Sequence, residues 1–240
     1  MIKLHPKGSL LSSFVEGSLP ASLSIVIASH VEMCPLCQQE IEHLTEQAAN
    51  VYFGHVPLKP MVGGDAGFID GDINMMHVDD ELDSEQLMML KAITETLPDD
   101  VQHNTSIAKE KEIEVSGVKF TLPRALQSVE RKSFQGLGKL SRSRLTIEDG
   151  NLRTSLLYID KGGCVPTHTH KGFEVTLLLQ GCFEDEMGTY HEGDFIWLDG
   201  EHTHQPVTKT GCICLTVSSD AIHFTQGVSQ LLNPIGQFIY

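Results

Sequence analysis

The chain has 240 residues, of which 40% are hydrophobic and 20% charged, a composition typical of a folded protein. Its length suits one large domain or two small ones, because domains usually hold about 100–200 residues. No window approaches the roughly 18 uninterrupted apolar residues of a membrane helix, and the N-terminus has no apolar core long enough for a signal peptide. We therefore expect a cytoplasmic protein that does not enter a membrane.

The net charge of −15 is spread unevenly along the chain. Residues 1–110 carry 5 Lys, no Arg and 17 acidic residues, a balance of −12, whereas residues 111–240 have a balance of only −3. The acidic first half would repel phosphates, which argues against direct nucleic-acid binding. The charge is compatible with a basic protein partner, and a role in solubility alone stays open as the simpler interpretation.

Apolar residues recur at helical spacing early in the chain and predict three helices, the first with Pro6 at its first position. These helices are expected over residues 5–16, 21–34 and 38–50. An irregular acidic loop is expected over 54–82, because prolines and glycines interrupt it repeatedly. A fourth helix fits 84–97 and ends before Pro98.

The second half changes to short alternating or β-rich runs that glycines punctuate. These runs cover residues 113–122, 153–160, 174–181, 193–200 and 212–219. Short strands at such spacing predict an antiparallel barrel or sandwich. We therefore expect a helical domain at 1–100, a linker at 101–112, a β domain at 113–225 and a C-terminal tail at 226–240.

The stretch HVEMCPLC holds a histidine and two cysteines within eight residues. His30 and Cys34 are four residues apart, so one helix face would carry both, and Cys37 can curl back at the helix end. His5, at the start of the first predicted helix, supplies a fourth candidate ligand. Zinc favours four N and S ligands in closed structural sites, and three small helices gain from such a staple. The spacing predicts a zinc site.

Two alternatives to a zinc site stay open for the cysteine pair. A Cys-x-x-Cys pair can be redox-active, although no βαβ pattern surrounds this one. Cys34 and Cys37 could also be buried small residues with no ligand role.

A second group of candidate ligands lies in GGCVPTHTHKGFEVTLLLQG. His168 and His170 are two apart on a predicted strand and point to one face, and Glu174 returns from the adjacent strand. The stretch matches the first cupin motif at every spacing, and GDFIWLDGEHTH resembles the second, with His204 as fourth ligand. This His3Glu set suits Zn, Fe, Mn or Ni, and a cupin barrel without a metal is the alternative.

The second motif departs from the usual cupin pattern at three positions. Asp199 and Glu201 stand where the pattern has proline and glycine, and Thr208 stands where it has asparagine. His202 lies nearby but falls outside the motif register. The conformation of this loop is therefore open.

Cys212 and Cys214 flank one residue on a predicted strand, so both face the same side. If that side is the barrel interior, their sulfurs lie near the metal site and are candidates for oxidation. The equally simple interpretation is that both are small core residues.

Residues 5–37 resemble the zinc-binding domain of anti-sigma factors, which is marked by His-x3-Cys-x2-Cys on its second helix. Together with the cupin motifs, the chain resembles the ChrR family of anti-sigma factors over nearly its whole length. The resemblance implies two domains: a small zinc-binding helical bundle and an antiparallel double-sheet cupin barrel.

The same resemblance implies a function. The helical domain would bind and inhibit an extracytoplasmic-function sigma factor, and the cupin would be needed for its release under singlet oxygen or related oxidative stress. Such a protein is a regulator rather than an enzyme. The alternatives are a metal-dependent cupin enzyme, such as a dioxygenase or isomerase with a helical appendage, and a module that binds a small-molecule signal.

Overall fold

The computed structural model describes two stretches of the chain and a few residues between them. The described residues are 2–53, 84, 88–89, 91–92 and 111–225. The predicted loop at 54–82 and tail at 226–240 lie outside these residues, as does most of the linker at 101–112 and of the predicted helix at 84–97. Among the described helices, none combines the length and the apolar character that crossing a membrane requires.

Three helices occupy the N-terminal part, as predicted, with different ends. They are α1 (Gly8–Val15), α2 (Ala21–Met33) and α3 (Pro35–Phe53). The prediction that Pro6 opens the first helix is wrong, since Lys7 is its extended N-cap. Cys34 was expected inside the second helix but is its C-cap, with φ −116° and ψ 102°. The reason is Pro35, which disfavours helical geometry in the residue before it and is itself suited to the first position of α3.

The β-rich part begins with a hairpin of β1 (Glu112–Val115) and β2 (Val118–Thr121). The run predicted as one strand over 113–122 is therefore two. Ser116 and Gly117 join them with φ of 51° and 79°, the left-handed geometry of a tight hairpin turn. The short helix η1 (Arg124–Leu126) follows.

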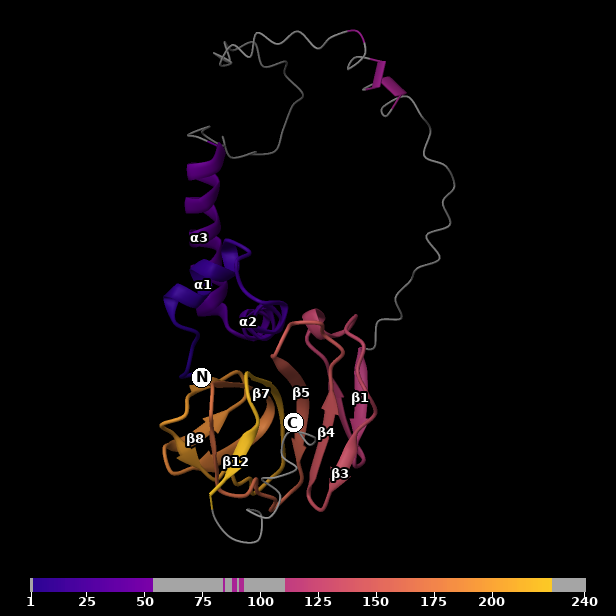
Figure 1. Ribbon diagram of the computed structural model, residues 1–240, viewed down its shortest axis with the longest axis vertical. Coiled ribbons are helices and arrows are strands. Elements are labelled where there is room, and N and C mark those ends of the chain that lie inside the picture. The colour runs from indigo at the N-terminus through magenta and orange to yellow at the C-terminus, as the bar shows by residue number, and fades with distance from the viewer. Residues whose placement is uncertain (1, 54–83, 85–87, 90, 93–110, 226–240) are drawn as a thin grey trace, which may run out of the picture. The chain divides into compact units, whose positions relative to one another are not determined.

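Two antiparallel sheets then build a barrel. The larger has the order β3, β4, β5, β11, β7, β8, with β9 also paired to β7. Its strands are β3 (Gln135–Leu137), β4 (Leu140–Arg144), β5 (Arg153–Ile159), β7 (Glu174–Asp185), β8 (Gly188–His191), β9 (Phe195–Leu198) and β11 (Cys212–Ser218). The smaller sheet has β6 (His168–His170) between β10 (Thr203–His204) and β12 (Ile222–Phe224). This is the β-rich, cupin-like domain that the motifs predicted (Figure 1).

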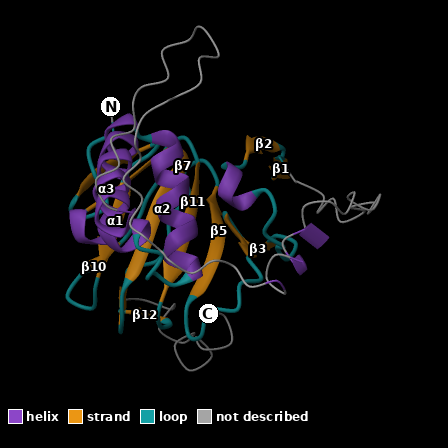
Figure 2. Cartoon of the chain, turned by 90° about the horizontal axis from the view of Figure 1, so that it is seen from above, coloured by secondary structure: helices purple, strands orange, loops and turns teal. Residues whose placement is uncertain are grey.

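The outer face of the larger sheet is apolar and is covered by helices. Along β11, Ile213, Leu215 and Val217 are fully buried and belong to the same hydrophobic cluster as Val26 and Ile27 of α2. In Figure 2 this helix runs across the strands of the sheet. The alternate residues of β11 point into the barrel, since successive side chains of a strand face opposite sides. The sheet therefore has a helix-covered face and a face that lines the barrel.

Candidate metal centres

The four ligands predicted in the helical part lie together. His5 Nδ1 is 3.3 Å from Cys34 Sγ and 3.5 Å from Cys37 Sγ, and His30 Nε2 is 3.3 Å from Cys37 Sγ. All four ligand atoms lie within 4.8 Å of one another. Two imidazoles and two thiols around one point are the donor set that a tetrahedral structural zinc prefers. The residues present therefore fit a zinc ion.

Each ligand comes from a different place in the chain. His5 lies in the extended segment before α1, not at the start of that helix as expected. His30 is on the last turn of α2, Cys34 is the bend between α2 and α3, and Cys37 is on the first turn of α3. The bend at Pro35 turns both cysteines toward His30, so a metal here would tie three segments together.

A backbone carbonyl of the barrel forms a hydrogen bond with one of the candidate zinc ligands, His30. His30 is fully buried, and its Nδ1 lies 2.8 Å from the carbonyl oxygen of Gly193, in the turn between β8 and β9. Burial lowers the pKa of His30 to about 4, so its ring is neutral at pH 7. A neutral ring that donates from Nδ1 to this carbonyl presents the lone pair of Nε2 to a metal. Burial, together with the neighbouring Cys34, raises the pKa of Cys37 to about 12 without a metal.

The residue after Gly193 holds the segment that carries His5. Asp194 accepts hydrogen bonds from the backbone N–H of Lys3 at 2.7 Å and of Leu4 at 3.1 Å. The N–H of Phe195 in turn donates to the carbonyl of Leu4 at 3.0 Å. Burial by itself would raise the pKa of Asp194, but these N–H donors lower it below its ordinary value. The turn between β8 and β9 thus contacts two of the four candidate ligands, one directly and one through its segment.

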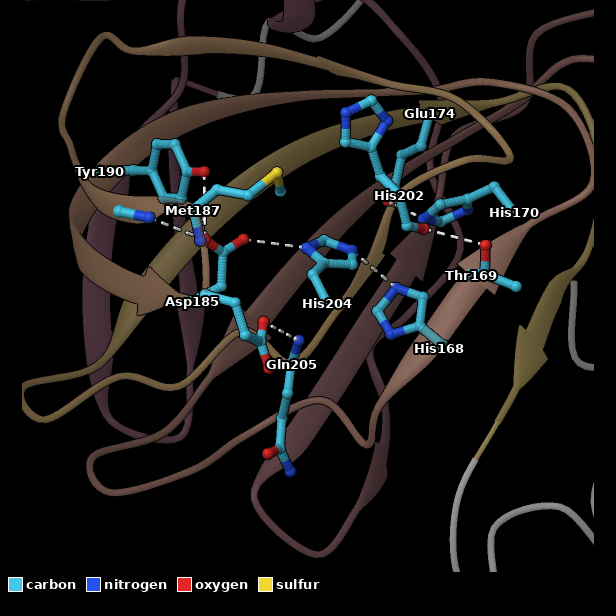
Figure 3. A network of polar contacts seen from close by, with 12 residues as sticks. His168, Thr169, His170, Glu174, Asp185, Met187, Tyr190, His202, His204 and Gln205 are labelled. Carbon is cyan, nitrogen blue, oxygen red and sulfur yellow. Dashed lines mark hydrogen bonds and ion pairs between the residues drawn. The ribbon is translucent and has the colours of Figure 1, made fainter.

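The second candidate centre lies between the two sheets of the barrel (Figure 3). The ligand atoms of His168, His170, Glu174 and His204 lie within 4.8 Å of one another. Glu174 Oε2 is 2.9 Å from His170 Nε2. The histidines belong to the three-stranded sheet, whereas Glu174 opens β7 of the facing sheet. The expectation that Glu174 lies on the strand adjacent to the histidines holds along the chain but not in the sheet.

Hydrogen bonds fix the ring tautomers of two of these histidines. His168 Nδ1 lies 2.8 Å from the carbonyl of Pro166, and His204 Nδ1 lies 3.0 Å from Asp185 Oδ2, so both rings donate from Nδ1. Their Nε2 lone pairs then face each other at 3.1 Å, an arrangement that a cation between them would stabilise. Among the described residues, Nδ1 of the buried His170 has no hydrogen-bond partner, and its Nε2 contacts Glu174. The cluster fits a divalent transition metal, and its donors do not distinguish zinc from Fe, Mn or Ni.

The charges of this cluster also favour a cation. Burial lowers the pKa of His168 to about 4, so its ring is neutral at pH 7. Burial would raise the pKa of Glu174, but the nearby His170 and the other two rings lower it, and the group stays ionised. An ionised carboxylate beside the neutral ring of His168 therefore favours a bound cation at this cluster.

Asp185 is a residue of this site that the motifs did not predict. Beside its contact with His204, its Oδ1 accepts hydrogen bonds from the N–H of Met187 at 2.9 Å and the hydroxyl of Tyr190 at 3.1 Å. Asp185 lies at the end of β7, nineteen residues from His204. No local spacing pattern signals this pairing, because the barrel alone brings the two residues together.

The three unusual positions of the second motif each find a local role. Asp199 accepts hydrogen bonds from the backbone N–H of Glu201 at 3.1 Å and from His202 Nδ1 at 2.7 Å, and so orders the loop. His202 is half-buried and takes no part in the cluster. The hydroxyl of Thr208 donates to the carbonyl of Cys182 at 2.6 Å and accepts from Gly211 at 3.0 Å.

Cys212 and Cys214 are both buried and belong to the same cluster of residues inside the barrel. A hydrogen bond with Cys214 lowers the pKa of Cys212, and the same bond, together with burial, raises that of Cys214. Cys214 also lines the cavity of about 410 Å³ that His168 and Glu174 border. The pair is therefore placed near the second candidate centre, and its redox role stays a prediction.

Comparison with known proteins agrees with this architecture. Residues 134–221 match the family model of the ChrR cupin-like domain. The anti-sigma-E factor ChrR of Cereibacter sphaeroides is 25% identical over 235 residues, which cover 97% of each chain. The crystal structure of Rhodobacter sphaeroides SigE in complex with the anti-sigma ChrR matches with a TM-score of 0.59 and 23% identity. That match covers 91% of this chain and 99% of the other, and it shows the fold. The resemblance to the ChrR anti-sigma factors that the motifs indicated is thus confirmed.

Proposed function

We propose that this chain is an anti-sigma factor whose zinc-bound helices hold an extracytoplasmic-function sigma factor inactive and whose cupin barrel conditions its release. The observation that carries the proposal is similarity to an anti-sigma factor along 97% of the chain. The two ligand clusters add support, because each of the two parts brings its own candidate metal centre. Under this proposal the protein acts in the cytoplasm, binds no nucleic acid itself and is a regulator like its homologue, not an enzyme.

Zinc would give the helices a fixed arrangement. The buried apolar side chains of α1 and α2 are few, namely Leu11, Leu23, Val26 and Ile27. Small helical units with so few core residues commonly need a metal or another staple. Because the metal would bind four ligands from separate segments, its binding free energy would stabilise the folded arrangement of those segments. Loss of the metal would therefore disorganise the surface that meets the sigma factor.

α3 offers a surface for that partner. Leu36, Val51 and Phe53 are large apolar residues with 62%, 79% and 80% of their surface exposed. Exposed acidic residues share this helix: Glu40, Glu42 and Glu46. Apolar anchors in an acidic setting suit a basic partner surface such as a DNA-binding face. A sigma factor held here would lose access to promoter DNA.

The turn between β8 and β9 gives the barrel a way to influence the helices. Gly193 contacts His30, and Asp194 holds the segment before His5. A change in the barrel that moves this turn would alter the surroundings of the zinc site and favour a second, released state. Oxidation is the proposed trigger, and Cys212 is the more reactive thiol because its pKa is lowered.

The test uses the zinc-loaded full chain and the purified extracytoplasmic-function sigma factors of the host. Calorimetry should detect tight binding of one of them, and in-vitro transcription by that sigma factor should stop. A chain with Cys34→Ser and Cys37→Ser should lose the zinc and the binding. Cys164→Ser, at an exposed cysteine, should leave both unchanged.

Treatment of the complex with singlet oxygen should then release the sigma factor. Replacement of Cys212 and Cys214 by serine should slow this release if the thiols are the sensor. If the folded, zinc-loaded chain binds none of the host's sigma factors, the anti-sigma proposal is wrong. Unchanged release from the serine variant would leave the anti-sigma proposal intact and remove the thiols as sensor.

The barrel cavity supports a second candidate function, as an enzyme or a ligand-binding module. A metal-dependent enzyme or ligand-binding module needs a roomy pocket with polar groups beside the metal. The cavity of about 410 Å³ meets that requirement, since Glu174, His168 and several other polar side chains line it. Turnover assays with the metal-loaded chain would detect an enzyme.

A further inference from the structure

The barrel cavity has a strongly apolar region. Its side chains there come from both sheets and include Leu157, Ile159, Phe183, Ile196, Leu198 and Phe224. Five of these residues are buried hydrophobic side chains, and Leu157 packs against the cluster that most of them form. The volume of about 410 Å³ falls in the range of small-molecule sites, which is about 300–1,000 Å³. An apolar body would therefore be sheltered from water here.

The same cavity also has a cationic region. Arg142 and Arg144 on β4 and Arg153 on β5 line it, and all three are half-buried. Arg142 and Arg144 flank the buried Ser143, so both side chains lie on the cavity face of the strand. Burial and the neighbouring Arg144 lower the pKa of Arg142, which means that the like charges are crowded in a poorly solvated place.

The carboxylates that line the cavity do not neutralise Arg142. Glu174 and Asp185 line the cavity, but each lies within 3.0 Å of a histidine ring nitrogen of the metal cluster. Arg153 donates to the backbone carbonyls of Gly150 and Leu152. Within the described residues, Arg142 forms no ion pair. A half-buried guanidinium that has no ion pair in a largely apolar cavity favours an anionic ligand.

Strand pairing sets the distance between this region and the metal cluster. Along the larger sheet, Arg144 pairs with Ser155, which pairs with Thr216, which pairs with Thr176 of β7. Three strand spacings of about 4.8 Å separate β4 from β7, roughly 14 Å in all. The strand that carries the arginines therefore lies roughly 14 Å along the sheet from the strand that carries Glu174, and both strands line the same cavity.

We propose that the barrel cavity binds an organic anion, with its acid group at Arg142 and its apolar body against the buried wall. A guanidinium group forms bidentate hydrogen bonds with a carboxylate or a phosphate group, so either one is a suitable head group for the ligand. The bound molecule would also contact the wall that carries His168 and Glu174. This site goes beyond the anti-sigma proposal and does not depend on it, because binding can be measured without a sigma factor.

The test is calorimetric titration of the full, metal-loaded chain with three probes that share one alkyl body. Decanoate and decyl phosphate carry the two candidate head groups, and decanol carries none. We expect at least one anion to bind about tenfold more tightly than decanol, because a guanidinium group forms stronger hydrogen bonds with an ionised head group than with a hydroxyl. The tighter of the two anions identifies the head group.

Variants locate the anion within the cavity. Arg142→Gln should weaken binding of the preferred anion about 10-fold to 100-fold, whereas Arg142→Lys, which keeps the charge, should weaken it less. Arg124→Gln removes the same charge at an exposed position outside the cavity and should bind as the wild type does. Thermal unfolding of each variant would confirm that it is folded.

Three results would overturn the proposal. One is equal affinity for decanol and both anions, and another is wild-type affinity in Arg142→Gln. The third is loss of binding in His168→Ala alone with the arginine variants unaffected, because the anion would then be bound at the metal cluster. None of these results bears on whether the chain binds a sigma factor.

Discussion

Asp185 fixes which nitrogen of His204 is available to a metal, because its Oδ2 accepts a hydrogen bond from Nδ1 of that ring. In Asp185→Asn, the amide could present its NH2 group to His204 Nδ1, and the ring would then carry its proton on Nε2, which faces the cluster. We expect the affinity of the barrel site for zinc to fall about 10-fold to 100-fold. Competition with a chromophoric chelator would measure this change.

The matched control is Asp199→Asn, which makes the same change beside a histidine that lies outside both ligand clusters. His202 lies 2.7 Å from Asp199, but it takes no part in either ligand cluster. Zinc affinity should stay at the wild-type value in this variant. If Asp185→Asn also binds zinc normally, the carboxylate does not set the tautomer of His204.

Sequence spacing predicted which residues cluster, and it did so for a physical reason. His168 and His170 share a strand face, and His30, Cys34 and Cys37 are close along the chain, so short-range geometry brings them together. The residues that support them are reached only through the fold. Gly193 lies 163 residues from His30, and no local pattern encodes such a contact.

At the scale of elements, Gly181 shows why the second glycine of the first motif is required. Its φ is 85°, and a Cβ here would press into the carbonyl oxygen of Gly211 and lie 3.1 Å from the Cα of Cys212. We expect Gly181→Ala to lower the free energy of unfolding by at least about 2 kcal/mol, since the backbone conformation alone costs about 1–2 kcal/mol for other residues. Urea denaturation would measure the loss.

Gly138→Ala separates the two causes of that loss. Gly138 also has a positive φ, 61°, but a Cβ there meets nothing within 4 Å. Only the conformational cost of about 1–2 kcal/mol should appear. A loss in Gly181→Ala no larger than in Gly138→Ala would mean that the pairing of β7 with β11 yields to the added methyl group.

The predicted elements were accurate where apolar periodicity is strong and incomplete where strands are short. Three helices and the strands β5, β7, β9 and β11 were found, because each carries a run of buried residues. β4 was missed because its sequence, LSRSR, is polar. Its alternate residues line a polar part of the cavity, so the pattern that marks an ordinary core strand is absent. The strands β3, β8 and β12 were missed as well, and β4 is the missed strand that carries Arg142 and Arg144.

At the scale of the whole molecule, the turn between β8 and β9 connects the barrel to the N-terminal segment that carries His5. Ile2 packs against Gly193, Lys3 and Leu4 donate to Asp194, and His5 follows directly. Because the carboxylate of Asp194 is buried and its pKa is lowered, its stabilising effect is present at neutral pH. The effect is lost as the pH falls through that lowered pKa.

Asp194→Ala should therefore loosen zinc in the helical part, although Asp194 is not a ligand. The change leaves the N–H groups of Lys3, Leu4 and His191 without their acceptor, and each lost bond to a charged group costs about 1.5–3 kcal/mol where the donor stays buried. We expect zinc to leave about tenfold faster when a chelator is added in excess. Asp220→Ala, at an exposed aspartate, should release it at the wild-type rate. Equal release from both variants would show that the barrel does not hold His5 in place, and the proposed route from the barrel to the helices would then have to run through Gly193 alone.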